Sequence, residues 1–159
     1  MSASLQNHDG PGGIINNQGI WAKIYNIQSK TWLTTSPFNV NQDSDGAQTD
    51  SATVALTGLK FLMAFSTDDY PSTINTRLWT PNSSSDITTN TWTAGNEESV
   101  NSVKIDGHRY LKWLRMPKVS KVLLTWDHFK SGNNNKVWGQ FYDMETGAKI
   151  GNDFILLGR

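Results

Sequence analysis

The segment "KVWGQFYDMETGAKIGNDFILL", residues 136–157, contains two strand-like runs joined by a turn. A second segment, "GIWAKIYNIQSKTWLTTSPFNVN" at residues 19–41, has the same order of features. When the two segments are aligned, aromatic, small and polar residues coincide: Trp21 with Trp138, Ala22 with Gly139, Ile24 with Phe141, Tyr25 with Tyr142 and Asn26 with Asp143. The sequence therefore predicts an internal repeat, and the copies of this repeat decide the fold.

The residue composition is typical of strands and turns rather than of helices. Seven Trp, six Phe and four Tyr stand among many Thr, Asn, Ser and Gly residues, and this favours an all-β fold. Apolar alternation and short apolar runs predict ten strands, at residues 20–26, 37–41, 51–56, 61–66, 76–80, 89–94, 110–115, 121–127, 136–143 and 153–157. A chain of 159 residues is long enough for one domain. We expect a flexible N-terminal arm at residues 1–18 and a single β-repeat domain at residues 19–159.

A third and weaker copy of the repeat is predicted in the middle of the sequence. Segments 60–79 and 121–138 both run from a Lys through an apolar strand and a polar loop to a second strand that bears a Trp. Phe61 and Val122 then begin matching strands, and the period is about 60 residues. Under this alignment three tryptophans become equivalent, namely Trp21, Trp79 and Trp138.

In this order of motifs the chain resembles the tandem propeller-like repeats of large bacterial and ciliate surface proteins. Their unit reads approximately F-x-V-N, then P-S-V-A-x-L-x-x-G-F-V-V-x-W, then Y-G-Q-x-Y-D-x-x-G-x-x-x-G-x-x-F. The counterparts here are "FNVN", "SATVALTGLKFLMAFS" and "GQFYDMETGAKIGNDF", and the likeness covers most of residues 19–157, with "YLKWLRMPK" departing from the pattern. The resemblance implies β-propeller-like, antiparallel four-stranded blades. It also implies an extracellular or cell-surface setting, and it implies no shared catalytic apparatus.

The number of predicted strands raises a question of assembly. Ten strands make about two and a half four-stranded blades, so we expect the chain to end on a half-blade without a following partner. Such a half-blade exposes unpaired backbone groups and an apolar face, and a second copy of the chain would cover them. Two chains would then form a ring of five blades, whereas open head-to-tail addition would form a filament. The alternative is a monomeric sandwich or small barrel that closes on itself.

The apolar residues of the terminal strands are the candidate assembly contact. Burying each such side chain contributes roughly 1.5 to 3 kcal/mol, enough in sum to hold subunits together. The candidates at the two ends are Ile20, Ile24, Phe38 and Val40, and Val137, Phe141, Phe154, Ile155 and Leu156. We therefore predict a non-enzymatic structural or adhesive module that self-assembles.

Composition and charge argue against several other functions. The 14 basic and 14 acidic residues balance, so no charge excess favours nucleic acid or anionic lipid. No stretch of about 20 apolar residues predicts membrane insertion, and no cysteine offers a thiol nucleophile or thiolate ligand. The first residues show no signal-peptide pattern, which leaves a cytoplasmic location open.

The polar residues show no pattern of an active site or a metal site. The three histidines, His8, His108 and His128, stand at unrelated spacings and are expected at the surface. Asp68 and Asp69 follow a predicted strand, where turn capping is their expected role. The segment "DSDG" at residues 43–46 begins like a calcium loop but lacks the later ligand. We expect no enzyme activity, no cofactor and no metal.

The aromatic residues support one alternative function, a multivalent lectin. Trp and Tyr rings stack on sugar rings, and repeated weak sites gain avidity from their number. The candidate sugar-binding residues are Trp21, Tyr25, Trp79, Trp138 and Tyr142. Packing between blades is the competing role for these rings. Asn82 begins an N-glycosylation sequon, "NSS", on a predicted loop.

Overall fold

The protein is an all-β structure built of antiparallel sheets. The computed structural model describes residues 2–4, 19–26, 29–34, 36–42, 48–67, 72–82, 92–102, 108–128 and 136–158. Its strands are β1 (Ser2–Ser4), β2 (Trp21–Lys23), β3 (Tyr25–Asn26), β4 (Thr31–Trp32), β5 (Phe38–Asn39), β6 (Gln48–Ala55), β7 (Phe61–Thr67), β8 (Ile74–Pro81), β9 (Trp92–Ser99), β10 (His108–Met116), β11 (Lys121–His128), β12 (Lys136–Asp143) and β13 (Lys149–Gly158). Two short 3-10 turns, η1 (Thr57–Leu59) and η2 (Pro117–Val119), join β6 to β7 and β10 to β11.

All ten predicted strands are present, with two additions. Strand β4 was not predicted, and Ser2–Ser4, inside the predicted arm, form β1 and pair with β2. The predicted strand at residues 20–26 is divided at Ile24 into β2 and β3. The rest of the predicted arm lies outside the described residues.

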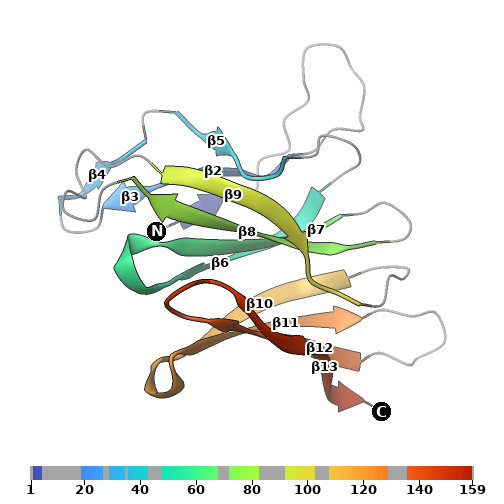
Figure 1. Ribbon diagram of the computed structural model, residues 1–159. Coiled ribbons are helices and arrows are strands. Elements are labelled where there is room, and N and C mark those ends of the chain that lie inside the picture. The colour runs from blue at the N-terminus through green and yellow to red at the C-terminus, as the bar shows by residue number, and fades with distance from the viewer. Residues whose placement is uncertain are drawn as a thin grey trace, which may run out of the picture.

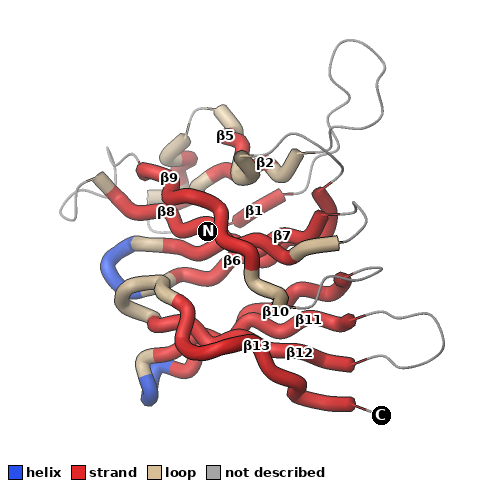
Figure 2. Tube along the Cα trace, turned by 45° about the vertical axis from the view of Figure 1, so that its right-hand side comes forward, coloured by secondary structure: helices blue, strands red, loops and turns tan. Residues whose placement is uncertain are grey.

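The sheets stack face to face in three layers (Figure 1). The first layer contains the sheet β1-β2-β5 and the hairpin β3-β4, the middle layer contains β6-β7-β8-β9, and the last layer contains β10-β11-β12-β13. Figure 2 shows the same stacking after a turn of 45°. Strand β10 also packs along β6, so the first strands of the middle and last layers lie side by side.

The last layer corrects one prediction from the sequence. Strands β12 and β13 were expected to form an isolated half-unit, but they belong to a complete four-stranded sheet. The segment that departed from the repeat pattern, "YLKWLRMPK", supplies the first strand, β10, which pairs with β11 from His108 to Met116. The first layer is the incomplete one, because its sheet contains three described strands.

The middle layer buries both of its faces. On one side Phe61, Met63 and Phe65 of β7 pack with Trp79 against the first layer. On the other side Leu62 and Ala64 of the same strand pack against the last layer. All residues from 61 to 66 are therefore buried, which explains why the sequence shows a continuous apolar run here instead of alternation.

A repeated hydrogen bond defines how the layers correspond to one another. Asn41 Oδ1 accepts a hydrogen bond from the backbone nitrogen of Ile20 at 2.8 Å, and Asn101 Oδ1 accepts one from that of Ile74 at 2.7 Å. In both layers the preceding Val nitrogen donates to the carbonyl of the same Ile at 2.7 Å. Ile20 and Ile74 are therefore equivalent. Each Asn accepts a hydrogen bond from the backbone nitrogen of a buried Ile, so this polar group is satisfied inside the protein.

This register corrects the predicted position of the middle tryptophan. With Ile20 over Ile74, Trp21 corresponds to Asn75 rather than to Trp79. The pairing of β7 with β8 agrees, because Phe61 lies opposite Trp79 whereas Val122 lies opposite Tyr142. The equivalent residues are thus Trp21, Asn75 and Trp138 in one row and Tyr25, Trp79 and Tyr142 in another. The predicted alignment of the two outer copies agrees with this register, and the middle copy was displaced by four residues.

A second set of contacts also recurs between layers. The carboxylate of Glu97 accepts a hydrogen bond from the backbone nitrogen of Gln42, which joins the middle layer to the first. In the same way, Asp153 Oδ2 accepts one from the backbone nitrogen of Ser102 at 3.0 Å, which joins the last layer to the middle. Gln42 and Ser102 each follow the equivalent Asn. We call each contact between two stacked layers a joint. The joint between the first and middle layers and the joint between the middle and last layers therefore contain equivalent hydrogen bonds.

We expect the Asn41 hydrogen bond to contribute measurably to stability. Substituting Asn41→Ala leaves the buried nitrogen of Ile20 without its acceptor, and it also removes the bond from Asn41 Nδ2 to Gln48 Oε1. The free energy of unfolding, measured by urea denaturation, should fall by about 1–3 kcal/mol. The control is Asn39→Ala, two residues away and exposed, which should change stability by less than about 0.5 kcal/mol. Equal effects of the two substitutions would contradict this role.

Candidate functional site

Equivalent faces of the three layers differ in what covers them. In the first layer Ile20, Ala22, Ile24 and Val40 face the middle layer and are buried. In the middle layer the corresponding row, which includes Ile74 and Val100, faces the last layer and is buried too. In the last layer the corresponding row is covered less: Val137 and Phe141 are half-buried, and Leu157 is exposed. Val100 is 6% exposed, whereas its counterpart Leu157 is 65% exposed.

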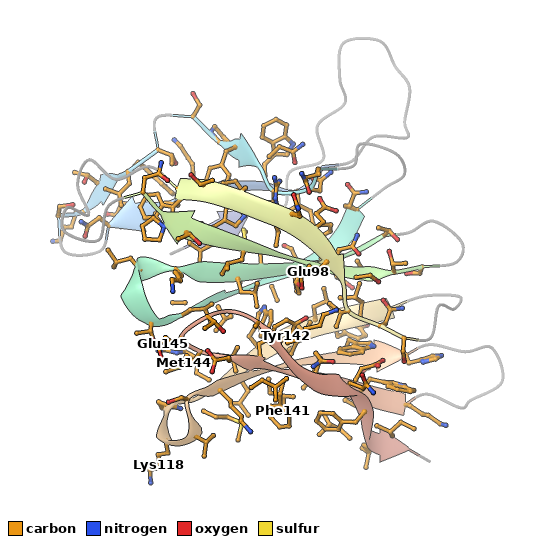
Figure 3. The ribbon with its side chains drawn as sticks, in the orientation of Figure 1. Glu98, Lys118, Phe141, Tyr142, Met144 and Glu145 are labelled. Atoms are coloured by element: carbon orange, nitrogen blue, oxygen red, sulfur yellow. The ribbon has the colours of Figure 1, made fainter. Side chains whose placement is uncertain are left out.

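The exposed side of the last layer, which we name the open face, is rich in apolar side chains. Leu114 is 56% exposed and Leu156 is 44% exposed, and both lie on this side with the half-buried Phe141. The apolar residues on this side are Leu114, Leu123, Val137, Phe141, Phe154, Leu156 and Leu157, and among them Leu123 is buried. In Figure 3, Tyr142 lies between the middle and last layers, while Phe141 lies on the opposite side of the last sheet. The same strand therefore divides its side chains between a core and a free surface.

Local packing holds the open face in shape. The rings of Phe141 and Phe154 stack with centroids 5.3 Å apart, and Lys121 Nζ lies 5.5 Å from the centre of the Phe141 ring. Gly139 leaves room for Leu156, because a Cβ at this position would come within 2.9 Å of Leu156 Cδ1 and the Leu156 side chain would have to shift. These contacts pack the apolar side chains of this face against one another.

The predicted assembly residues fall into two groups. Ile20, Ile24 and Val40 are buried inside the chain, so the prediction that they contact another copy is corrected. Phe38 also packs against the core between the first and middle layers. The residues predicted at the other end remain partly or largely exposed on the last layer, namely Val137, Phe141, Phe154, Ile155 and Leu156. Leu114 and Leu157 were not among the predicted residues, and the strand pairing places them on the same sheet.

The predicted sugar-binding residues are also distributed over different environments. Trp79 and Tyr142 are buried between layers, which favours packing over sugar binding for these two rings. Trp138 is half-buried and stacks on the ring of His128, with centroids 6.0 Å apart and an interplanar angle of 26°. Trp21 and Tyr25 are partly exposed on the outer side of the first layer. Trp32, which was not among the predicted sugar-binding residues, is 52% exposed and lies beside Tyr25.

Trp32 belongs to a small aromatic group on the first layer. Its ring meets Tyr25 edge to face at 5.0 Å, and Lys23 Nζ lies 4.9 Å from the centre of the indole ring. The pairing of β3 with β4 produces this contact, since Tyr25 lies opposite Trp32. Predicting a short strand at Thr31–Trp32 from the sequence would have indicated this contact between Tyr25 and Trp32.

A small cleft lies between the middle and last layers. Its volume is about 230 Å³, and its lining residues are Leu62, Thr76, Leu78, Gly95, Asn96, Glu98, Thr146, Gly147 and Ala148. Gly147 has φ of +77° and approaches Leu78 so closely that a Cβ would lie 2.8 Å from Leu78 Cδ1. Pockets for drug-sized ligands usually measure about 300–1,000 Å³. The cleft is below that range, and Glu98 is the one carboxylate among its lining residues.

The shifted pKa values in the described residues have structural causes. Burial raises the pKa of Tyr142, and desolvation lowers the pKa of Arg77, partly offset by Glu97. Hydrogen bonds from Thr146 lower the pKa of Asp143, whose Oδ1 accepts bonds from the backbone and hydroxyl of Thr146 in the turn between β12 and β13. Each of these three groups has a place in packing or in a turn.

Other candidate positions give little further chemistry. His128 was expected at the surface but is buried at the end of β11, which corrects that prediction.

No cluster of three or more metal-ligating side chains is found in the part of the chain that the structure describes. Within the same residues, no helix is long and apolar enough to cross a membrane. His8, Asp68, Asp69 and residues 43–46 lie outside the described residues. Asn82 is exposed, and its Oδ1 accepts a hydrogen bond from Thr93 at 2.5 Å.

Comparisons with protein-family models, with curated proteins and with solved structures found no match for this chain. Function must therefore be argued from the chain's own surfaces. The open face is the most distinctive of these, because two equivalent faces in the same molecule are covered.

The difference between covered and open faces leads to a matched prediction. Val100→Asn places an amide in the core between the middle and last layers, and it should lower the free energy of unfolding by about 2–4 kcal/mol. Leu157→Asn, at the equivalent exposed position, should change it by less than about 0.5 kcal/mol. Urea denaturation at low protein concentration, where self-association contributes least, measures both. Comparable losses would mean that Leu157 is covered within the chain.

Proposed function

We propose that the protein is a non-enzymatic structural or adhesive module whose activity is to associate with copies of itself. The observation that carries this proposal is the open face, an ordered apolar surface with Leu114 and Leu157 more than half exposed. Contiguous apolar patches of this kind usually mark interaction sites. A partner is the simplest way to remove this surface from water.

The three layers support a β-propeller-like architecture as part of this proposal. The middle layer packs on both faces, and β6 and β10 lie side by side, as the inner strands of neighbouring blades do in a propeller. Propellers typically contain about four to eight blades. Three layers are too few to close such a ring, so the proposal places the missing contacts on other chains.

The chemistry of the described residues also favours a contact function over catalysis. Active sites characteristically contain groups with pKa values shifted toward a catalytic role, and the shifts found here follow from packing and turn formation. The proposed setting is extracellular or at a cell surface, and this rests on the resemblance to surface-protein repeats.

Sugar binding is a second candidate, favoured by the exposure of Trp32 next to Tyr25. An exposed indole beside a tyrosine offers an apolar platform for a sugar ring. A glycan array probed with the wild-type chain and with Trp32→Ala separates the two functions. Binding that disappears in the variant would establish a lectin, whereas a blank array is the result expected for a purely structural module.

We expect self-association to depend on the open face. Analytical ultracentrifugation over a concentration series should show particles heavier than the 17.7-kDa chain. Leu157→Glu places a charge in the contact and should weaken association at least about tenfold, the effect of losing roughly 1.4 kcal/mol. The control Leu59→Glu changes a surface Leu of the middle layer and should leave association intact. A wild-type chain that stays monomeric at high micromolar concentration would overturn the proposal.

A further inference from the structure

Both joints inside the chain are built in the same direction. Each joint places the side of one layer that carries the Ile20 or Ile74 row against the opposite side of the next layer. That opposite side carries the aromatic row, with Trp79 of the middle layer in one joint and Tyr142 of the last layer in the other. The open face of the last layer is equivalent to the sides that carry the Ile20 row and the Ile74 row. Val137 occupies the position of Ile20 and Ile74 on it.

The outer side of the first layer is equivalent to the aromatic sides of the middle and last layers. Trp21 and Tyr25 lie on its side away from the middle layer, because Ile20, Ala22 and Ile24 alternate with them and are buried. By the register of the sheets, Trp21 is equivalent to Trp138 and Tyr25 is equivalent to Tyr142. Trp138 and Tyr142 pack against the middle layer. Trp21 and Tyr25 remain partly exposed.

The geometry points to a specific partner for the open face: the outer side of the first layer in a second copy of the chain, with Trp21 and Tyr25 against Leu114, Phe141 and Leu157. This inference rests on the self-association proposed above and specifies its mode. The contact is heterologous, head to tail, and it repeats the arrangement of the two joints within the chain. A chain that already contains two such joints has surfaces shaped for a third.

The joint between copies differs from the internal joints in one respect. Where Glu97 and Asp153 accept backbone hydrogen bonds across the internal joints, the register of the first layer places Pro37, which has no carboxylate. The joint between copies therefore depends on its apolar and aromatic residues. This makes Trp21, Tyr25 and Leu157 the residues whose substitution has the largest effect.

The number of layers favours a closed ring of two copies. One chain contributes three layers, and two chains contribute six, which lies within the range of about four to eight blades that propellers contain. Head-to-tail contacts in such a pair occur twice, so that each copy uses both of its ends. The ring then has no uncovered end on which further copies could add.

Native mass spectrometry of paired variants tests this arrangement. The tail variant Leu157→Glu blocks the open face, and the head variant Trp21→Glu blocks the first layer; Tyr25→Ser replaces the head variant if circular dichroism shows that Trp21→Glu is unfolded. We expect the wild type at twice the 17.7-kDa chain mass and each variant alone as a monomer. An equimolar mixture of head and tail variants should form mixed pairs containing one of each, because one joint stays intact.

Other outcomes identify which statement fails. If the head variant pairs as well as the wild type while the tail variant does not, the open face meets a second open face, and the head-to-tail inference is overturned while self-association stands. A wild-type mass that rises beyond two copies with concentration would overturn the closed ring. A wild type that is monomeric at all concentrations would overturn the proposed function itself.

Discussion

The burial of strand β7 on both faces is the constraint on which the rest of the structure depends. Phe61, Met63 and Phe65 require cover on one side, and Leu62 and Ala64 require cover on the other. A single sheet cannot supply both, so the middle layer needs a neighbour on each face. With each large side chain worth roughly 1.5 to 3 kcal/mol on burial, the three-layer stack follows from this one strand.

The last layer also has apolar side chains on both faces, but only one of these faces is covered by another layer. Strand β12 buries Tyr142 against the middle layer and presents Phe141 to the outside. Its neighbours add Leu114 and Leu157 to that side. A sheet with two apolar faces and one covered face is typical of a subunit rather than of a finished molecule. The proposed function and the head-to-tail joint both follow from this asymmetry.

Equivalent positions carry different side chains where their surroundings differ. Arg77 and Gln140 occupy equivalent positions in the third strands of the middle and last layers. Arg77 donates a hydrogen bond to the carbonyl of Gly95 in the fourth strand of its layer. Gln140 donates to the carbonyls of Ile150 and Gly151 in the fourth strand of its own layer. Both strands shift register at these points. A repeat can therefore vary in sequence and still satisfy the same backbone groups.

The sequence by itself determined ten strand segments and the outer copies of the repeat, because alternation and short apolar runs are local signals. It missed the short strands β1 and β4. It could not align the middle copy with the outer copies. Trp79 and Trp21 are the same residue type, but strand pairing makes Asn75 the equivalent of Trp21. It also could not tell that Ile20 and Val40 are covered while Leu157 is exposed, as all three are simply apolar residues in strands. Only the tertiary structure decides this, because the stacking order of sheets is set by contacts between segments far apart in the chain.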